Sequence, residues 1–176
     1  MALKSTVFKV TLQIANMDNH YYADHVLTVA SHPSENEARL MTRLLAFALN
    51  AHERLEFANG LTDQDEPDIW LKELTGDIKL WIMVGQPDEK AILKACGRSA
   101  EVRVYTQRSN ADAWWATAAG KLERARNLSV FKFDASAIED LAKLVDRSMN
   151  LLYTMQDGEI WVRNDTESVQ VGITQL

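Results

Sequence analysis

Hydrophobic and polar residues alternate near the start of the chain. In residues 5–15, Phe, Val, Leu and Ile occupy every second position among Thr, Lys and Gln. A period of two is typical of a strand with one buried face. Residues 21–30, which follow the turn-forming stretch at 16–19, are interpreted as a second strand. The two segments therefore predict a β-hairpin.

The next pattern has a helical period. Ser34 is followed three residues later by Glu37, which matches a capping box at a helix N-terminus. Leu40, Leu44 and Phe47 then recur at helical spacing and form an apolar stripe. We predict a helix that begins at this box and runs to about position 52.

The middle of the chain predicts a strand–helix–strand unit. Residues 56–66 indicate an acidic loop and residues 67–72 a short strand, and a turn at 75–76 leads into the apolar run 78–84, which is typical of a central strand. Asp88 is placed to cap a helix over 88–97 whose Ile92, Leu93 and Cys96 would face inward. A strand over 102–106 follows, and this order predicts a parallel pair.

The last third of the chain alternates helix and strand. The pattern predicts helices at 112–126 and 135–147, strands at 128–133 and 169–174, and a hairpin over 150–163 that turns at Asp157-Gly158. Together the elements predict an α/β fold with one mixed sheet, in a single domain that spans residues 1–176.

Composition narrows the class of protein. The chain has 176 residues, a net charge of −6 and a single cysteine, so an intramolecular disulfide is excluded. No window holds 18 consecutive apolar residues and the first residues lack a secretory signal, so we expect a cytoplasmic protein without a membrane partner. Residues 56–77 carry seven acids and one base, whereas residues 98–126 carry six bases and three acids. An acidic segment beside a basic one suits a metal next to a polyanion, and it equally suits solvated surface charge.

Carboxylate side chains are the candidate site residues. The sequence has no nucleophile elbow, P-loop, dinucleotide-binding glycines or His-Glu-x-x-His zinc motif. It does place Glu35 and Glu37 at the start of the first helix and Asp68 on a short strand. Hard oxygen ligands on adjacent rigid elements are what a divalent metal needs for phosphodiester hydrolysis.

Several motifs, in order along the chain, resemble the bacterial YaeQ family. They are His-Pro-Ser-Glu at 32–35, Arg-Leu-Leu-Ala at 43–46, Gly-Leu at 60–61, Asp-Glu-Pro-Asp at 65–68, Trp-Ile-x-Val-Gly-Gln-Pro-Asp-Glu at 81–89, Lys-Ala-Cys at 94–96, Trp-Trp at 114–115, Asn-Leu-Ser-Val at 127–130 and Gln-Asp-Gly at 156–158. The resemblance implies a PD-(D/E)XK nuclease-like core, in which helices flank a central mixed sheet that carries an extra hairpin. The family has also been linked to transcription antitermination.

The resemblance implies a set of site residues. Asp68 and Glu35 would bind Mg²⁺ or Mn²⁺, with Glu37 as the alternative helix acid. Lys94, or Lys90 on the same helix, would replace a missing catalytic lysine. Met83 stands where the family has Glu, and Gly85 stands where a nuclease would have Lys. Met is a poor ligand for Mg²⁺, so the third motif is degenerate.

Nucleic acid contacts are expected from Arg39, Arg43, Gln86 and Tyr105. Structural roles are open for the same residues. Glu37 can cap its helix, Glu35 can complement the helix dipole, and Asp68 can be a turn or strand-edge acid. Arg39 and Arg43 can pair with Glu35 and Asp68, Lys94 can be a solvated helix residue, and Tyr105 can be a core residue of its strand.

Two functions therefore compete. One is a divalent-metal-dependent phosphodiesterase that acts on nucleic acid. The other is a binding or regulatory protein, with transcription as one possible setting, that keeps the nuclease-like fold and has lost the chemistry; its partner would be nucleic acid or protein. Met83, Gly85 and the negative charge favour the second, and the carboxylates favour the first.

Overall fold

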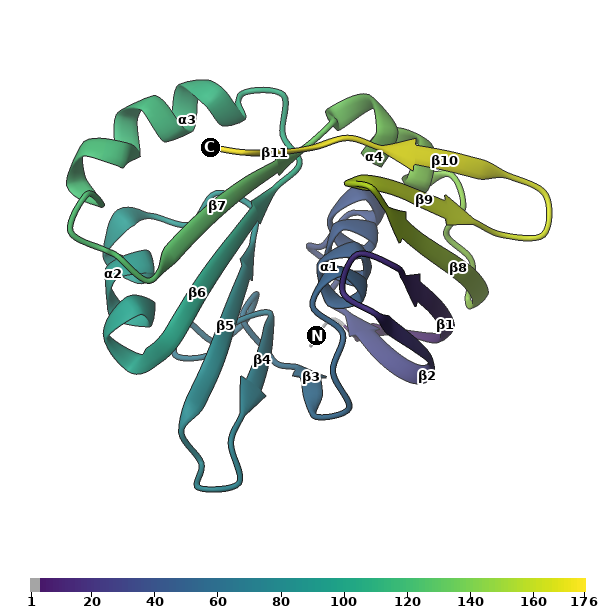
Figure 1. Cartoon of the computed structure of the whole chain (residues 1–176), viewed down its shortest axis with the longest axis horizontal. Helices are drawn as coiled ribbons and strands as arrows, with labels where there is room; N and C mark the ends of the chain where they lie inside the picture. Colours follow the sequence, from purple (N-terminus) through teal and green to yellow (C-terminus); the bar gives the residue numbers. More distant parts are fainter. Residues whose placement is uncertain (1–3) are drawn as a thin grey trace. The chain divides into compact units, whose positions relative to one another are not determined.

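The computed structural model describes residues 4–176, which form two units (Figure 1). The first unit comprises the chain up to Ala51 together with Asp134–Gly172. The second comprises His52–Phe133 and Ile173–Leu176. Each unit has its own mixed sheet, so the fold is α/β as expected, whereas the expectation of one sheet is wrong. That residues 1–176 act as one domain stays a prediction.

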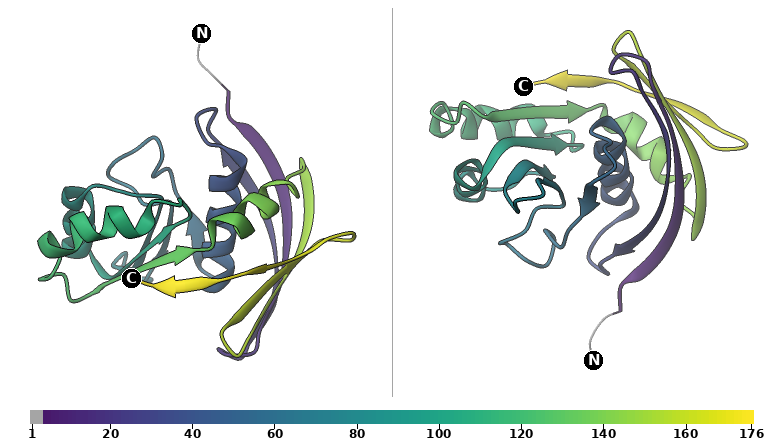
Figure 2. Two further views of the ribbon diagram at one scale, coloured as in Figure 1. Left: turned by 90° about the horizontal axis from the view of Figure 1, so that it is seen from above. Right: turned by 60° about the horizontal axis from the view of Figure 1, so that its bottom comes forward.

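The first unit is a five-stranded sheet with two helices. The strand order is β10-β9-β8-β1-β2, and β1 pairs antiparallel with β2 and parallel with β8. Figure 2 shows both helices on the same face of this curved sheet. The elements are β1 (Thr6–Asn16), β2 (Tyr21–Ser31), α1 (Glu37–Leu49), α4 (Ala135–Ala142), β8 (Ser148–Gln156), β9 (Glu159–Arg163) and β10 (Ser168–Val171).

The inner face of this sheet is apolar because every second residue of its strands points inward. Val10, Leu12 and Ile14 of β1 are buried, as the alternating pattern predicted. The hairpin of β8 and β9 is also confirmed, and its turn residues Asp157 and Gly158 both have positive φ. Two consecutive left-handed residues match the twist of a two-residue hairpin turn.

The second unit is a six-stranded sheet in the order β11-β7-β6-β5-β4-β3, with parallel pairs β5–β6 and β6–β7. Trp81 and the buried face of α2 lie in an apolar cluster against β6. The elements are β3 (Leu55–Phe57), β4 (Ile69–Lys72), β5 (Ile78–Val84), α2 (Glu89–Arg98), β6 (Ser99–Thr106), α3 (Ala111–Ala118), the short 3-10 helix η1 (Ala119–Lys121), β7 (Leu128–Phe133) and β11 (Ile173–Gln175).

The last predicted strand divides between the two sheets. Residues 169–174 were expected to form one strand, but the strands separate at Gly172. Ser168–Val171 pairs with β9 in the first sheet, and Ile173–Gln175 pairs with β7 in the second. Figure 1 shows the yellow chain passing from β10 to β11. The alternation of side chains indicates which face of a strand is buried, but it does not indicate which strand it pairs with. The division into two strands could therefore not be predicted from it.

Two predicted helices are shorter than their patterns. The helix expected at 112–126 ends at Ala118 and passes into η1, which contains the helix-disfavouring Gly120. The helix expected at 135–147 ends at Ala142, and three backbone hydrogen bonds between residues three apart then turn the chain toward β8. In α2, Asp88 caps the helix and Ile92 is buried as predicted, but Leu93 is 43% exposed.

The cap of α1 differs from the predicted capping box. The Asn36 side chain accepts a hydrogen bond from the Arg39 N–H at 2.8 Å, and α1 begins at Glu37. Ser34 instead hydrogen-bonds His32, its hydroxyl lying 2.6 Å from the ring Nδ1. The N-cap therefore lies two residues later than the box indicated, at Asn36 and not at Ser34.

This difference gives a direct test. Replacing Asn36 by Ala should lower the free energy of unfolding by about 1 kcal/mol, because it leaves a backbone N–H of the first turn without its acceptor. Replacing Ser34 by Ala should change it by less than half of that. Urea unfolding followed by circular dichroism measures both, and a larger loss in Ser34→Ala would restore the capping box.

Among residues 4–176, no helix is both long and apolar enough to cross a membrane.

Candidate functional site

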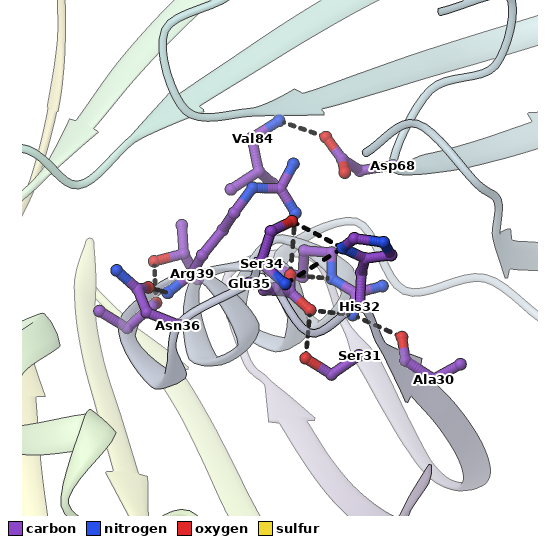
Figure 3. A network of polar contacts seen from close by, with 12 residues as sticks. Ala30, Ser31, His32, Ser34, Glu35, Asn36, Arg39, Asp68 and Val84 are labelled. Carbon is purple, nitrogen blue, oxygen red and sulfur yellow. Dashed lines mark hydrogen bonds and ion pairs between the residues drawn. The ribbon is translucent and has the colours of Figure 1, made fainter. Parts of the chain in front are cut away.

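Glu35 lies at the centre of a buried polar network in the first unit (Figure 3). Its side chain is 1% exposed, and both carboxylate oxygens accept hydrogen bonds. Oε1 accepts from Arg39 and from Arg43 at 2.8 Å each, and Oε2 accepts from Arg43 at 2.8 Å and from the Ser31 hydroxyl at 2.7 Å. The carboxylate is thus held by two guanidinium groups and a hydroxyl.

Arg43 is the principal partner in this network. It lies on α1, is 5% exposed, and binds Glu35 through Nε and Nη2. The same Nη2 also donates to the Ala30 carbonyl of β2 at 2.9 Å. A bidentate guanidinium–carboxylate pair of this kind has fixed geometry and is among the stronger side-chain hydrogen-bond arrangements. Arg43 therefore links α1 directly to Ala30 of β2 and, through Glu35, to Ser31 at the end of the same strand.

The sequence left two roles open for Arg39 and Arg43, pairing with acids and contact with phosphate, and the network bears on the first. The predicted pairing of Arg39 and Arg43 with Glu35 is confirmed. Their role as phosphate ligands stays a prediction, and their guanidinium groups already hold a buried acid. Glu37, the alternative helix acid, is exposed in the first turn of α1, where a negative charge favours the helix dipole. Its catalytic role also stays a prediction.

Asp68 holds the end of a strand in the second unit. It is 6% exposed, and one of its carboxylate oxygens accepts a hydrogen bond from the Val84 N–H at 2.8 Å (Figure 3). Its backbone is also engaged, because its N–H donates to the Ile82 carbonyl and its carbonyl accepts from the Ala58 N–H. Pairing between β4 and β5 begins at Ile69, one residue later. The Asp68 side chain thus accepts the hydrogen bond of Val84, the last residue of β5, at a point where β4 no longer pairs with β5.

The segment before Asp68 is closely packed against Gly60. A Cβ added at Gly60 would overlap the Pro67 carbonyl carbon, and the Gly60 N–H donates to the Pro67 carbonyl at 2.8 Å. Only glycine allows the two stretches of backbone to approach so closely. This contact holds the backbone before Asp68 in place. The Gly-Leu motif in the sequence did not predict such a contact.

The third motif has no metal-binding chemistry at its two predicted positions. Met83, on β5, is partly buried and packs against the apolar cluster that contains Trp81. Gly85 follows β5 with φ of +105°, a conformation that a lysine would adopt only with strain. The Gly85 N–H donates to the Tyr105 carbonyl, so the backbone is tied down at this point. Met83 and Gly85, the two departures from the nuclease motif, therefore also have structural roles in and after β5.

Lys94 lies on the exposed face of α2 and pairs with Asp65. The two side chains are 55% and 69% exposed, and the hydrogen bond from Lys94 is the main cause that lowers the pKa of Asp65. Arg98, one turn later, donates to the Asp65 carbonyl. Both bases attach α2 to the acidic loop. The interpretation of Lys94 as a surface residue fits this position, and its catalytic role stays a prediction.

Gln86 and Tyr105 also have partners within the second unit. The Gln86 amide donates to Asn110 at 2.9 Å, which connects the end of β5 to the start of α3. Tyr105 is 2% exposed, and its ring stacks with the rings of Phe131 and Phe133, whose centroids are 5.2 and 5.4 Å away. Tyr105 is therefore a core residue of its strand. Contact of either residue with nucleic acid stays a prediction.

The residues present do not fit a resident Mg²⁺ or Mn²⁺. The Glu35 oxygens are used by two cations and a hydroxyl, and the position of the third acid holds a thioether. No group of three or more His, Cys, Asp or Glu side chains within 4–176 is arranged to hold a metal ion. Glu35 and Asp68 belong to different units, and their pairing in one site stays a prediction.

Sequence reasoning missed Ser31 and undervalued Arg43. The predicted strand ended at residue 30 and gave Ser31 no role, but its hydroxyl completes the shell around Glu35. A signal for Arg43 was present, because it interrupts a run of apolar residues in the centre of α1. A charge at such a position is almost never fully buried unless it is paired, so a buried partner could have been sought.

Comparison with known proteins places the chain in a family. The family model described as YaeQ protein matches residues 1–173. An uncharacterized protein named YaeQ from Escherichia coli K12 is 42% identical over 175 residues, which cover 99% of this chain and 97% of that protein. The crystal structure of a YaeQ protein from Xanthomonas axonopodis pv. citri has a TM-score of 0.93 and 46% identity, with 97% of each chain covered. A second, from Pseudomonas syringae, has a TM-score of 0.94 and 30% identity, covering 98% of this chain and 96% of that one. The expected resemblance is confirmed: this chain belongs to the YaeQ family.

Proposed function

We propose that this chain is a binding protein that does not hydrolyse phosphodiesters. In this proposal the residues that resemble a nuclease site stabilise the fold. The central support is the Glu35 carboxylate, which is 1% exposed and has both oxygens occupied by Arg39, Arg43 and Ser31. A metal could use this carboxylate only after displacing two guanidinium groups, and truncating one partner of such a buried pair leaves an uncompensated charge.

The third motif supports the same conclusion from a different direction. Metal-dependent hydrolysis needs an acid that binds the metal and a group that positions the attacking water. Met83 contributes apolar packing, and Gly85 occupies a backbone conformation unsuited to lysine. Lys94, the substitute lysine, forms a salt bridge with Asp65. Each candidate catalytic position in this segment thus has another task in the second unit.

Protein is the partner class that the surface favours. Several bases that would meet phosphate are paired with acids of the same unit: Arg103 with Glu101, Lys121 with Glu89, and Lys132 with Asp112. By contrast, the outer face of the first sheet has a mainly apolar row over four strands. The row crosses β2, β1, β8 and β9. Its neighbouring residues are, in that order, Tyr22, Ala15, Thr154 and Trp161. Aromatic residues exposed in this way are enriched in protein–protein interfaces.

The test is a cleavage assay with Mn²⁺ on labelled single-stranded and double-stranded DNA and RNA. The natural protein should leave all four substrates intact. Met83→Glu restores the family's acid and is the matched variant, because it changes the third motif alone. Cleavage by Met83→Glu only would still support the proposal, since it would show a site disarmed at position 83.

Cleavage by the natural protein that disappears in Asp68→Ala would contradict the proposal and establish an enzyme. Binding to the same nucleic acids is measured in parallel over a range of salt concentrations. Phosphate contacts give a steep loss of affinity with salt, so a steep slope would replace the proposed protein partner by nucleic acid.

A further inference from the structure

One edge of the first sheet borders a groove. β10 is the terminal strand on this side of the sheet, and α4 packs against it (Figure 1). A groove of about 510 Å³ lies between the two elements. One side is lined by residues of α4 and its flanking turns, and the other by residues 167–170. The groove therefore runs beside a sheet edge and belongs entirely to the first unit.

β10 has backbone groups that no other strand uses. It pairs antiparallel with β9, and in the turn between them the Asn164 N–H donates to the Glu167 carbonyl. Backbone groups in such a pair point alternately toward and away from the partner, so those of Ser168 and Gln170 point away from β9. In the described part of the chain no strand pairs with that side. The free edge ends at Gly172, whose carbonyl is bound by a backbone N–H at the start of α4.

Apolar residues form the buried part of the groove lining. Ala137 of α4 is 5% exposed, and Leu144 and Val169 are half-buried. Successive side chains of a strand point to opposite faces, so alternate side chains of a strand added beside β10 would face α4 and pack on these residues. A free sheet edge next to a side-chain groove is the arrangement by which proteins bind extended peptides.

The exposed part of the lining is acidic. Asp134, Asp140 and Glu167 line the groove together with a single base, Lys143. Lys143 pairs with Asp140 at 3.1 Å. The Glu167 carboxylate has no hydrogen bond or ion pair with any residue in the described part of the chain. The rim thus keeps an excess of negative charge, which is complementary to a basic ligand.

We propose that this groove binds an extended, basic segment of a partner protein, which adds to the first sheet as a strand beside β10. The backbone groups of Ser168 and Gln170 bind the main chain of the segment, and the acidic rim selects Lys or Arg among its side chains. This inference rests on the proposed binding function for the class of partner. It adds the place of binding and the chemistry of the segment.

The probe is an acetylated, amidated hexapeptide in which Val and Lys alternate, titrated into the isotope-labelled full chain. The amide signals of Ser168 and Gln170 should shift in the NMR spectrum, and hydrogen exchange at both should slow. A matched peptide with Glu in place of each Lys should bind about tenfold more weakly, because like charges then meet at the rim.

Protein variants separate the charge from the backbone. Glu167→Lys should weaken binding about fivefold, in the range of an exposed ion pair. Glu159→Lys is the matched control, because Glu159 is an exposed acid of β9 that does not line the groove, and its variant should bind normally. Gln170→Pro removes the N–H that points away from β9 and should abolish binding. Proline is tolerated at such edge positions, and circular dichroism confirms that the variant is folded.

Backbone methylation of the peptide tests strand addition without changing the protein. Methylating one alternate set of peptide nitrogens should abolish binding, and methylating the other set should preserve it. Binding that survives both methylations, equal binding of the Lys and Glu peptides, or no shift at Ser168 and Gln170 would overturn the proposal. The titrations contain neither Mn²⁺ nor nucleic acid, so their failure would leave the result of the cleavage assay unchanged.

Discussion

Replacing Glu35 by Ala should lower the free energy of unfolding by about 3–5 kcal/mol, because it removes the buried anion that Arg39 and Arg43 share. Arg43 is 5% exposed and would be left as a buried cation, and the Ser31 hydroxyl would lose its acceptor. Urea unfolding followed by circular dichroism measures the change. We expect the largest loss of structure in the first unit, visible as faster amide exchange in α1.

Glu37→Ala is the matched control for this variant. Glu37 is two residues away, is exposed, and has the same charge, so its removal should cost no more than a few tenths of a kcal/mol through the helix dipole. Arg39 is 16% exposed, and Arg39→Ala should be milder than Glu35→Ala since Arg43 still pairs with the acid. Equal stability of Glu35→Ala and the natural protein would show that the buried network has no structural role.

Replacing Asp68 by Ala should lower the free energy of unfolding by about 1–3 kcal/mol. The buried Val84 N–H would lose the carboxylate oxygen that now lies 2.8 Å away, and no β4 residue continues the ladder to that point. Leaving a buried donor unsatisfied is more costly than removing both partners. Chemical unfolding measures the loss, and amide exchange at Val84 reports it locally.

Asp68→Asn separates hydrogen bonding from charge. The amide oxygen of Asn still accepts from Val84, so this variant should be closer in stability to the natural protein than Asp68→Ala. Asp77→Ala removes an exposed acid near the opposite end of β5 and should have little effect. If Asp68→Ala proved as stable as Asp77→Ala, the strand-end role of Asp68 would be wrong.

Elements with strong local signals could be predicted closely from the sequence. The run of apolar residues at 78–84 and the strand predicted at 128–133 coincide with β5 and β7. The Asp157-Gly158 turn is also local, because Asp and Gly tolerate the positive φ that both residues adopt there. Such signals depend on neighbours in the chain, which is why they needed no tertiary information.

Partner choice could not be predicted from the same patterns. β10 and β11 lie next to each other in sequence, yet they pair with strands of different sheets. Alternation defines which face of a strand is buried but carries no information on which edge it meets. The single sheet expected from the sequence was wrong for this reason, and the helix end at Ala142 depends on where β8 must begin.

The sequence identified the candidate site residues correctly as unusual, but it did not predict their structural roles. The sequence identified Glu35, Asp68 and Arg43 as unusual, and all three are buried or have buried side chains. A carboxylate that binds a metal and a carboxylate that binds two arginines look the same in a sequence. The partners decide between the two, and Arg43 and Ser31 reach Glu35 only because α1 returns along the end of β2.

Glu35 and Asp68 are proposed to stabilise the fold and not to hold a catalytic metal. Calorimetric titration of the natural protein with Mn²⁺ is the most direct test of that proposal. We expect no saturable heat above that of dilution, and the same flat titration for Asp68→Ala. Saturable binding by the natural protein that is lost in both Asp68→Ala and Glu35→Gln would contradict the proposal and make the two acids metal ligands.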